Sequence, residues 1–409
     1  MLLVVGVVVI VSPVIKRGFE GRQLPPAIGY ILLGLLLSWI DAVAGALALD
    51  RGVALGVLAE IGVIVLLFRV GLECNLPALV AQLGKATVIW IVNMTVAAAL
   101  GMATVLAFTD YGLIPALFTG AALSATSVGV STVVWRDLGL LETPAGSLLV
   151  DVAELDDISA VLLISLLFAL VPAIQAPDQI GLAAMLGTKA LVLLVTTALF
   201  LGLCLFFSVR IEPVATAWFT KLDPDTGPIL WAAGTAIFIA ACAEASGLSF
   251  AIGALFAGLA FSRDPLHETI DRSFNDLYGF FSPFFFVGIG LSVDLTQMGP
   301  AVGIGALLLV AAVLGKLVGA GGPAALMMGP RAGAAIGFSM VPRAEIALIV
   351  MGYGLGLGAW AMPPSLFNAM VFVSLATCVI GPLAVRALWG GAPTTTGGGD
   401  GDPGKVAGF

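Results

Sequence analysis

The sequence PAGSLLVDVAELDDISAVLLISLLFALVP, residues 144–172, is long enough to cross a bilayer as one helix, for which about 20 residues suffice. Its first half nevertheless carries four acidic residues, which are Asp151, Glu154, Asp156 and Asp157. A charged side chain at bilayer depth costs on the order of 3 kcal/mol or more, so these acids must face a wet cavity, meet cations or hold protons. Asp156 and Asp157 lie near the middle of the span and point about 100° apart, so one can face a cavity while the other meets a partner helix. Such a stretch is typical of an ion or proton site.

The composition places the chain among polytopic helical membrane proteins. Of its 409 residues, 60% are hydrophobic and only 10% are charged, which no soluble globular domain matches. The net charge of −8 says little about partners, because much of the acid lies inside the membrane. Basic runs are missing, so nucleic acid is not expected as a partner. The four cysteines lie far apart in apolar runs and predict neither a disulfide framework nor a metal site, and no cofactor is expected.

Hydropathy and turn residues predict about thirteen transmembrane spans and an all-α fold. The spans are residues 2–16, 25–40, 53–74, 86–107, 112–134, 145–171, 188–209, 227–246, 249–262, 277–294, 300–321, 331–355 and 364–389. With the N-terminus outside, nearly every loop cation falls on the cytoplasmic side, and only Arg51 and Lys189 fall outside. The prediction is therefore a multi-pass protein of the inner (cytoplasmic) membrane, N-out and C-in, with a disordered tail over residues 390–409.

An internal repeat relates the two halves of the chain. Leu24–Ser38 matches Leu248–Ser262 at seven positions, and Gly71–Leu76 matches Gly290–Leu295 in the same order. Roughly six spans, one linker span and six more would place the halves in opposite orientations, which is the inverted repeat of many secondary transporters. Chance similarity between glycine- and leucine-rich helices is the alternative, and two ordered matches weaken it.

Two spans that correspond in this repeat, 112–134 and 331–355, are predicted to be broken at mid-depth. The residues expected to break or support them are Ser124, Thr126, Ser127 and Gly129 in the first span and Met340, Pro342, Arg343 and Glu345 in the second. Pro342 cannot donate a backbone hydrogen bond, and hydroxyl side chains can loosen helical bonds. Broken helices expose amide and carbonyl ends that hold small ions. Close packing through small residues, or an ordinary proline kink, is the alternative.

Lys316 lies inside the span 300–321 and needs an acid, a lost proton or a helix end to compensate its charge. Asp156 or Asp157 is the natural partner, and a lysine that reaches toward the membrane surface is the alternative. Arg343 and Glu345 are expected to satisfy each other and the neighbouring backbone rather than to bind substrate.

Together these residues resemble the monovalent cation:proton antiporter-2 family, and most closely its NapA-type sodium/proton antiporters. The resemblance extends over nearly all of residues 1–390. The motifs that carry it are Ala-Thr-Ser-Val-Gly at 125–129, the pair Asp156-Asp157, Lys316, Pro-Arg-Ala-Glu at 342–345 and Leu-Leu-Phe-Arg-Val-Gly-Leu-Glu at 66–73.

The resemblance implies roles for the site residues. Asp157 would bind the cation, Na⁺, or the proton, and Asp156 would pair with Lys316. Thr126 and Ser127 would contribute to the ion site beside the crossing broken helices. The implied function is exchange of Na⁺ (or Li⁺) for H⁺, electrogenic because of the double aspartate, and K⁺/H⁺ exchange is the alternative.

The resemblance also implies a homodimer in which core helices move against a scaffold. Residues 85–172 and 298–389 would form the core, residues 1–84 and 226–297 the scaffold, and residues 173–225 a linker helix.

Three charged residues depart from the family pattern, namely Arg69, Asp151 and Glu154. Arg69 and Asp151 match in depth, so we hypothesise a charged inner vestibule in which Arg69 holds Asp151. Glu154, three residues before Asp157, would line the approach to the ion site. The alternative is that Arg69 reaches the membrane surface and the two acids merely face water.

Other function classes explain the sequence less well. An intramembrane aspartyl protease needs two aspartates that face each other, usually from separate helices, and adjacent residues on one helix have the wrong geometry. A channel does not account for the inverted repeat or for Lys316. A sodium-coupled carrier of organic solutes would need an organic-ligand pocket, for which the sequence gives no sign. The chain is therefore not expected to be an enzyme.

Overall fold

The computed structural model describes residues 2–22, 24–44, 53–73, 76–127, 129–174, 182–262 and 267–389, and throughout this part the regular structure is helical. The predicted tail lies outside the described residues. The elements are α1 (Leu2–Glu20), α2 (Pro26–Ala44), α3 (Val53–Glu73), α4 (Leu76–Phe108), α5 (Leu113–Ser124), α6 (Gly129–Asp137), α7 (Pro144–Ile174), α8 (Leu182–Arg210), α9 (Glu212–Leu222), α10 (Gly227–Ala245), α11 (Phe250–Phe261), α12 (His267–Leu291), η1 (Leu295–Gln297), α13 (Met298–Lys316), η2 (Leu317–Gly321), α14 (Gly322–Met328), α15 (Pro330–Ser339), α16 (Glu345–Leu357) and α17 (Pro364–Trp389).

Every predicted span coincides with one helix or with an interrupted series of helices. Within the described residues, seven helices are long and apolar enough to cross a membrane, or eight if α8 and α9, bent by 50°, form one span. The apolar helices α5, α11 and α16 are shorter. The helical class and the multiple membrane helices are thus confirmed, whereas the count of about thirteen spans and the N-out orientation stay predictions. Helix α9 was not predicted.

Both predicted helix breaks are present, and they contact each other. The first separates α5 from α6, and the second separates α15 from α16. The backbone N–H of Ser127 donates to the carbonyl of Pro342 over 2.9 Å. Ser131 Oγ donates to the carbonyl of Ser339 over 2.8 Å, and Trp135 Nε1 donates to Ser339 Oγ over 2.7 Å. The ends of four half-helices therefore meet in one place.

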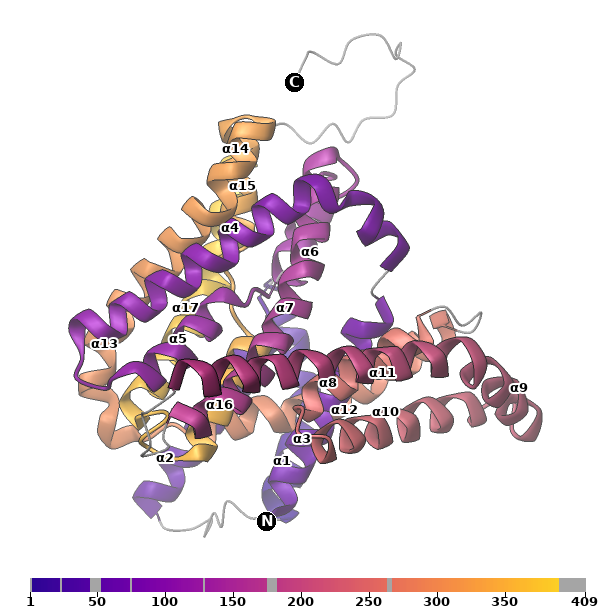
Figure 1. Cartoon of the computed structure of the whole chain (residues 1–409). Coiled ribbons are helices and arrows are strands. Elements are labelled where there is room, and N and C mark those ends of the chain that lie inside the picture. Colours follow the sequence, from indigo (N-terminus) through magenta and orange to yellow (C-terminus); the bar gives the residue numbers. More distant parts are fainter. Residues whose placement is uncertain are drawn as a thin grey trace, which may run out of the picture.

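The helices pack in two groups, and the assignment of these groups as scaffold and core stays a prediction. Helices α2 and α3 pack with α12, and α11 packs with α3 and α10, while α4 packs with α5, α7 and α13, and α13 and α15 pack with α17. Figure 1 shows α8, α10 and α11 running beside one another, with α4 and α15 inclined to them. A movement of one group against the other stays a prediction.

Close glycine contacts join the helices in a symmetric pattern. A Cβ atom at Gly34 in α2 would lie 2.9 Å from Gly290 Cα in α12, and a Cβ atom at Gly258 in α11 would lie 1.9 Å from the Phe68 carbonyl oxygen in α3. Gly34 and Gly258 hold equivalent positions in the sequence repeat, and so do Gly290 and Gly71, which lies against α11. Equivalent residues thus make equivalent contacts, as a two-fold relation between the halves requires. The contacts support the inverted repeat, which stays a prediction.

The helix that carries Lys316 lies against the backbone of α4. After Lys316 the α-helix continues as one π-helical turn, η2, before α14 begins. A Cβ atom at Gly319 in this turn would lie 2.8 Å from Asn93 Cα, and one at Gly315 would lie 3.1 Å from Ala97 Cα. Such turns occur frequently at functional sites. Here the small residues bring the lysine to the centre of the core group.

Candidate ion-binding site

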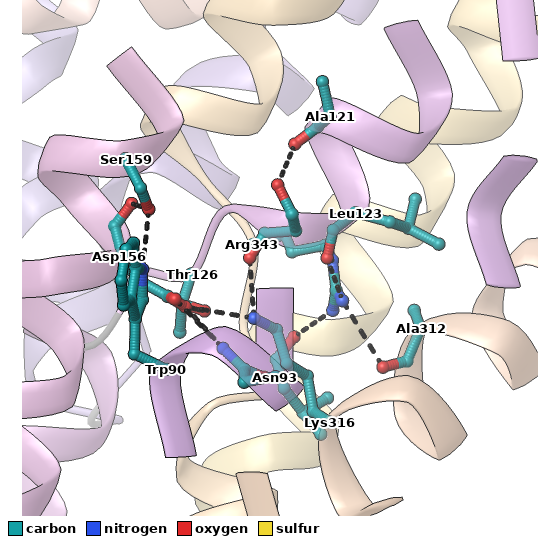
Figure 2. Close-up of polar contacts among 12 residues, drawn as sticks. Trp90, Asn93, Ala121, Leu123, Thr126, Asp156, Ser159, Ala312, Lys316 and Arg343 are labelled. Atoms are coloured by element: carbon teal, nitrogen blue, oxygen red, sulfur yellow. Dashed lines mark hydrogen bonds and ion pairs between the residues drawn. The ribbon is translucent and has the colours of Figure 1, made fainter. Parts of the chain in front are cut away.

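Asp156 lies at the centre of a buried polar network (Figure 2), and only 1% of its surface is exposed. Lys316 Nζ donates to Asp156 Oδ2 over 3.1 Å, so the predicted ion pair is present. Thr126 Oγ1, in the first helix break, donates to the same oxygen over 2.6 Å. Asn93 Nδ2 donates to both carboxylate oxygens, over 3.0 and 2.8 Å. Three side chains thus donate to this carboxylate, and Oδ2 accepts from all three of them.

Asp157 has the opposite environment. It is partly exposed, and within the described residues no hydrogen bond or ion pair to its carboxylate is found. Its electrostatic neighbours are Asp156, Glu345, Glu154 and Lys316, so acids predominate around it. An open carboxylate among other acids can take up a proton or a small cation. The two adjacent aspartates therefore differ, because three side chains donate to Asp156 and none of the described residues donates to Asp157.

A cavity of about 400 Å³ lies beside the first helix break. Ser127 and Gly129 from the break line it together with Glu345 and with Glu20 at the end of α1. Ser127 Oγ donates to Glu345 Oε2 over 2.8 Å. Glu345 is also an electrostatic neighbour of Asp157, which itself does not line the cavity. A cation that enters it meets oxygen ligands and negative charge.

Arg343 is fully buried and binds backbone rather than acid (Figure 2). Its guanidinium donates to the carbonyl of Leu123 over 3.2 and 2.6 Å and to the carbonyl of Val341 over 2.7 Å. No ion pair to Glu345 occurs in the part of the chain that the structure describes, so the predicted mutual pairing is wrong and the predicted backbone role is confirmed. Arg343 and Glu345 compensate different helix ends.

The charges at the breaks match the helix dipoles. Lys316 Nζ donates to the carbonyl of Ser124 over 2.7 Å, and Arg343 binds that of Leu123, so two cations lie at the C-terminus of α5. Glu345 is the first residue of α16 and lies at its N-terminus. Cations are favourable at helix C-termini and anions at N-termini. The remaining predicted support residues are structural: Met340 is buried and bonds the last turn of α15, and the carbonyl of Pro342 joins the breaks.

The predicted pairing of Arg69 with Asp151 is wrong. Arg69 Nε donates to Asp271 Oδ1 in α12 over 3.1 Å, and Nη1 donates to Asn275 Oδ1 over 3.2 Å. Asp151 is buried, and its Oδ2 has no hydrogen-bond partner within the described residues. The prediction used only the matching depths of Arg69 and Asp151, which do not show whether their helices are neighbours. The helix of Arg69, α3, packs against α12, which carries Asp271. Glu154 lies close enough to Asp157 to act on it, and its role in the approach to the site stays a prediction.

Three residues of the network were not predicted from the sequence. Asn93 binds Asp156 directly, while Trp90 Nε1 donates to Ser159 Oγ over 2.9 Å and Ser159 Oγ donates to the carbonyl of Asp156 over the same distance. Asn93 lies in the middle of an apolar stretch of α4. A polar residue at that depth, like a charged one, calls for a buried partner, and this signal could have identified it.

Nearly the whole chain is similar to proteins of known function. The transmembrane sodium/hydrogen exchanger family matches residues 5–390. The chain is 28% identical to the Na(+)/H(+)-K(+) antiporter GerN of Bacillus cereus over 368 residues, 90% of each protein. It is 27% identical to the high-affinity Na(+)/H(+) antiporter NhaS3 of Synechocystis, covering 83% of this chain and 72% of that protein. The structure of the sodium proton antiporter MjNhaP1 from Methanocaldococcus jannaschii matches with a TM-score of 0.67 and 14% identity, over 95% of this chain and 98% of that one.

Proposed function

The chain belongs to the sodium/hydrogen exchanger family, and we propose that it exchanges Na⁺, or Li⁺, for H⁺ by binding both ions in turn at Asp157. It is a multi-pass membrane protein and a cation/proton antiporter, not an enzyme. The cation and the proton are its substrates, and no cofactor enters the proposal. The family membership supports cation/proton antiport, and the role of Asp157 as the shared binding group is what we propose in addition.

One observation carries this assignment, namely the contrast between the two adjacent aspartates. Asp156 accepts hydrogen bonds from Asn93, Thr126 and Lys316, whereas Asp157 accepts none from the described residues. A carboxylate without donors in an acidic surrounding binds either a proton or Na⁺, but not both together. If the core can change sides only when Asp157 is occupied, competition at this group couples the two fluxes.

Electrogenic exchange needs a second proton carrier, and Lys316 is the candidate. Its side chain is fully buried, and Arg343 is one of its electrostatic neighbours. When Na⁺ binds near the two aspartates, a third positive charge in the same buried space is unfavourable. Lys316 would then release its proton, so that two protons move for one Na⁺. This count makes the exchange sensitive to membrane potential.

Movement of the core group against the scaffold group would supply alternating access. The breaks in α5–α6 and α15–α16 belong to the core, and the 400 Å³ cavity lies between these breaks and the ends of α1 and α2. A scaffold that remains still in the bilayer while the core moves suits the homodimer that we propose. We also propose that the protein lies in the inner (cytoplasmic) membrane, because nearly all loop cations fall on one side of the predicted spans.

K⁺/H⁺ exchange is the second candidate. It is favoured by the similarity to GerN, whose name includes both Na⁺ and K⁺. A carboxylate and hydroxyl groups do not by themselves separate the two cations, because both are hard ions that prefer oxygen ligands.

Reconstitution into proteoliposomes with a pH indicator tests the proposal. A proton gradient is imposed, and Na⁺, Li⁺ or K⁺ is added across a pH series. We expect Na⁺ and Li⁺ to dissipate the gradient with saturable kinetics, K⁺ to do so much less, and the rate to change with an imposed membrane potential. Equal rates with K⁺ would favour the second candidate, and absence of any response would exclude exchange.

A further inference from the structure

A second cavity, of about 320 Å³, is lined by side chains of α1, α2 and α12. It shares no lining residue with the 400 Å³ cavity beside the first helix break, so it is separate from the candidate ion-binding site. Pockets that bind small molecules have volumes of about 300–1,000 Å³. The second cavity is therefore large enough to hold a small polar group.

The cavity lies where both of its long helices change between polar and apolar sequence. Helix α1 is largely apolar up to Ile15 and continues with Lys16 and Arg17. In α12 the order is reversed, because its first half is polar and an apolar run begins at Phe280. Lys16 and Asp276 lie near these two boundaries and line the same cavity. The cavity therefore lies at the level of the lipid headgroups, whichever side of the membrane the N-terminus occupies.

Two opposite charges line the cavity without pairing. Lys16 contributes an ammonium group from α1, and Asp276 contributes a carboxylate from α12. Neither side chain forms an ion pair or a hydrogen bond with another described residue. A ligand that carries one negative and one positive group can therefore bind to both.

Asn275 adds hydrogen-bond donors beside Asp276. Its Oδ1 accepts from Arg69 Nη1 over 3.2 Å, so the donors of its side-chain amide remain for a ligand in the cavity. A phosphate near Lys16 would meet an ammonium group and a neutral amide. Asp276 would repel the phosphate and attract an ammonium group instead. The cavity thus fits a zwitterion that contains a phosphate and an amine.

The apolar part of the lining favours a lipid over a water-soluble zwitterion. Val9, Pro13 and Phe280 line the same cavity, and Val9 and Phe280 are 38% and 48% exposed. A soluble headgroup would leave these side chains uncovered, whereas the acyl chains of a phospholipid would cover them. The charged and the apolar residues therefore match the two parts of one lipid molecule.

We propose that this cavity binds a zwitterionic phospholipid whose headgroup carries a primary amine, which is the phosphatidylethanolamine class. Lys16 and Asn275 bind the phosphate, Asp276 accepts hydrogen bonds from the ammonium group of the lipid, and the acyl chains lie against Val9 and Phe280. The site is additional to the proposed exchange, and lipid binding can be measured without transport.

Native mass spectrometry of the purified full-length protein in detergent tests the proposal. It measures the affinity for phosphatidylethanolamine, phosphatidylcholine and phosphatidylglycerol with identical acyl chains. The choline group has no N–H to donate to Asp276, and phosphatidylglycerol has no cationic group. We expect the unmodified protein to bind phosphatidylethanolamine about tenfold more tightly than either of the other lipids.

Three variants separate the parts of the site. Asp276→Asn should abolish the preference for phosphatidylethanolamine over phosphatidylcholine, and Lys16→Gln should weaken the binding of both lipids about tenfold. Gly279→Leu changes no charge. A Cβ atom at Gly279 would meet nothing within 4 Å, and Gly279 lines the cavity, so the larger side chain should occupy part of it and exclude the lipid.

Two exposed residues outside the cavity supply the matched controls. Arg17→Gln removes a positive charge next to Lys16, and Asp225→Asn removes a negative charge from the turn between α9 and α10. Both variants should bind the three lipids as the unmodified protein does.

Four outcomes would overturn the proposal. Two of them are equal affinities of the unmodified protein for the three lipids and an unchanged lipid preference in Asp276→Asn. The third is displacement of the lipid by soluble phosphoethanolamine at equal concentration, which would assign the cavity to the free zwitterion. The fourth is a smaller dimer fraction in Gly279→Leu with unchanged lipid binding, which would mean that a second copy of the chain covers the cavity.

Discussion

Lys316 and Asp156 form an ion pair of 3.1 Å in which the side chains are 0% and 1% exposed. Removing one partner of a buried pair leaves an uncompensated charge, which costs about 3–5 kcal/mol. We therefore expect Lys316→Ala to lower the free energy of unfolding by about that amount, measured by thermal unfolding in detergent.

The pair of Arg69 with Asp271 supplies the control for this measurement. Its side chains are 21% and 33% exposed, and such pairs contribute about 0–1 kcal/mol. Asp271→Ala should therefore lower stability only slightly. A loss in Lys316→Ala no larger than in Asp271→Ala would contradict the buried-pair argument.

The second prediction concerns Asp157, the carboxylate that accepts no hydrogen bond from the described residues. Asp157→Asn keeps the shape of the side chain and removes the charge that a cation needs. Cation-dependent proton flux in proteoliposomes should disappear, while Tm stays close to that of the unmodified protein, because no partner is left unpaired. Asp110→Asn, in the exposed turn between α4 and α5, should transport normally. Normal flux in Asp157→Asn would remove Asp157 from the mechanism.

A third prediction concerns Glu345 in the wall of the 400 Å³ cavity. Glu345→Gln keeps an oxygen that accepts from Ser127 Oγ and removes one negative charge near Asp157. A change of about 1 kcal/mol in the electrostatic attraction would raise the apparent KM for Na⁺ about fivefold. Maximal rate should change little, and the effect should be larger at low ionic strength. An unaltered KM at low salt would mean that Glu345 is only a helix-end residue.

How much of this site the sequence predicts depends on the physical signal that each residue carries. The breaks follow from Pro342 and the hydroxyl cluster around Thr126, and the pair of Lys316 with Asp156 follows from the cost of charge in a membrane. Both predictions require only an estimate of how deep each residue lies along its membrane span. The open state of Asp157 needed the structure, because it depends on which donors reach each carboxylate.

The depth of a residue along its span does not predict which helices are neighbours. Arg69 and Asp151 match in depth but lie on helices with different neighbours, and the true partner, Asp271, is on α12, which begins earlier than the predicted span. Asn93 is neutral, so its burial in the membrane costs less than that of a charged residue and gives a weaker signal in the sequence. The π-helical turn after Lys316 lies in close contact with α4, and no local sequence rule specifies it.

The last prediction tests the symmetric glycine contacts. A Cβ atom at Gly258 would lie 1.9 Å from the Phe68 carbonyl oxygen, and one at Gly34 would lie 2.2 Å from the Val287 carbonyl oxygen. Backbone atoms cannot move aside as the end of a flexible side chain can. A methyl group at Gly258 would therefore push α11 away from α3, and one at Gly34 would push α2 away from α12. Overpacking of this kind costs about 1–3 kcal/mol, and we expect both Gly258→Ala and Gly34→Ala to lower Tm.

The control is Gly234→Ala in α10, where a Cβ atom meets nothing within 4 Å. There alanine should raise stability by about 0.5–1 kcal/mol, because glycine weakens a helix interior. If Gly258→Ala or Gly34→Ala were as stable as Gly234→Ala, the close contact would be wrong. Since Gly34 and Gly258 are equivalent in the repeat, their losses should also be similar in size, and a large loss at one position alone would count against the two-fold relation between the halves.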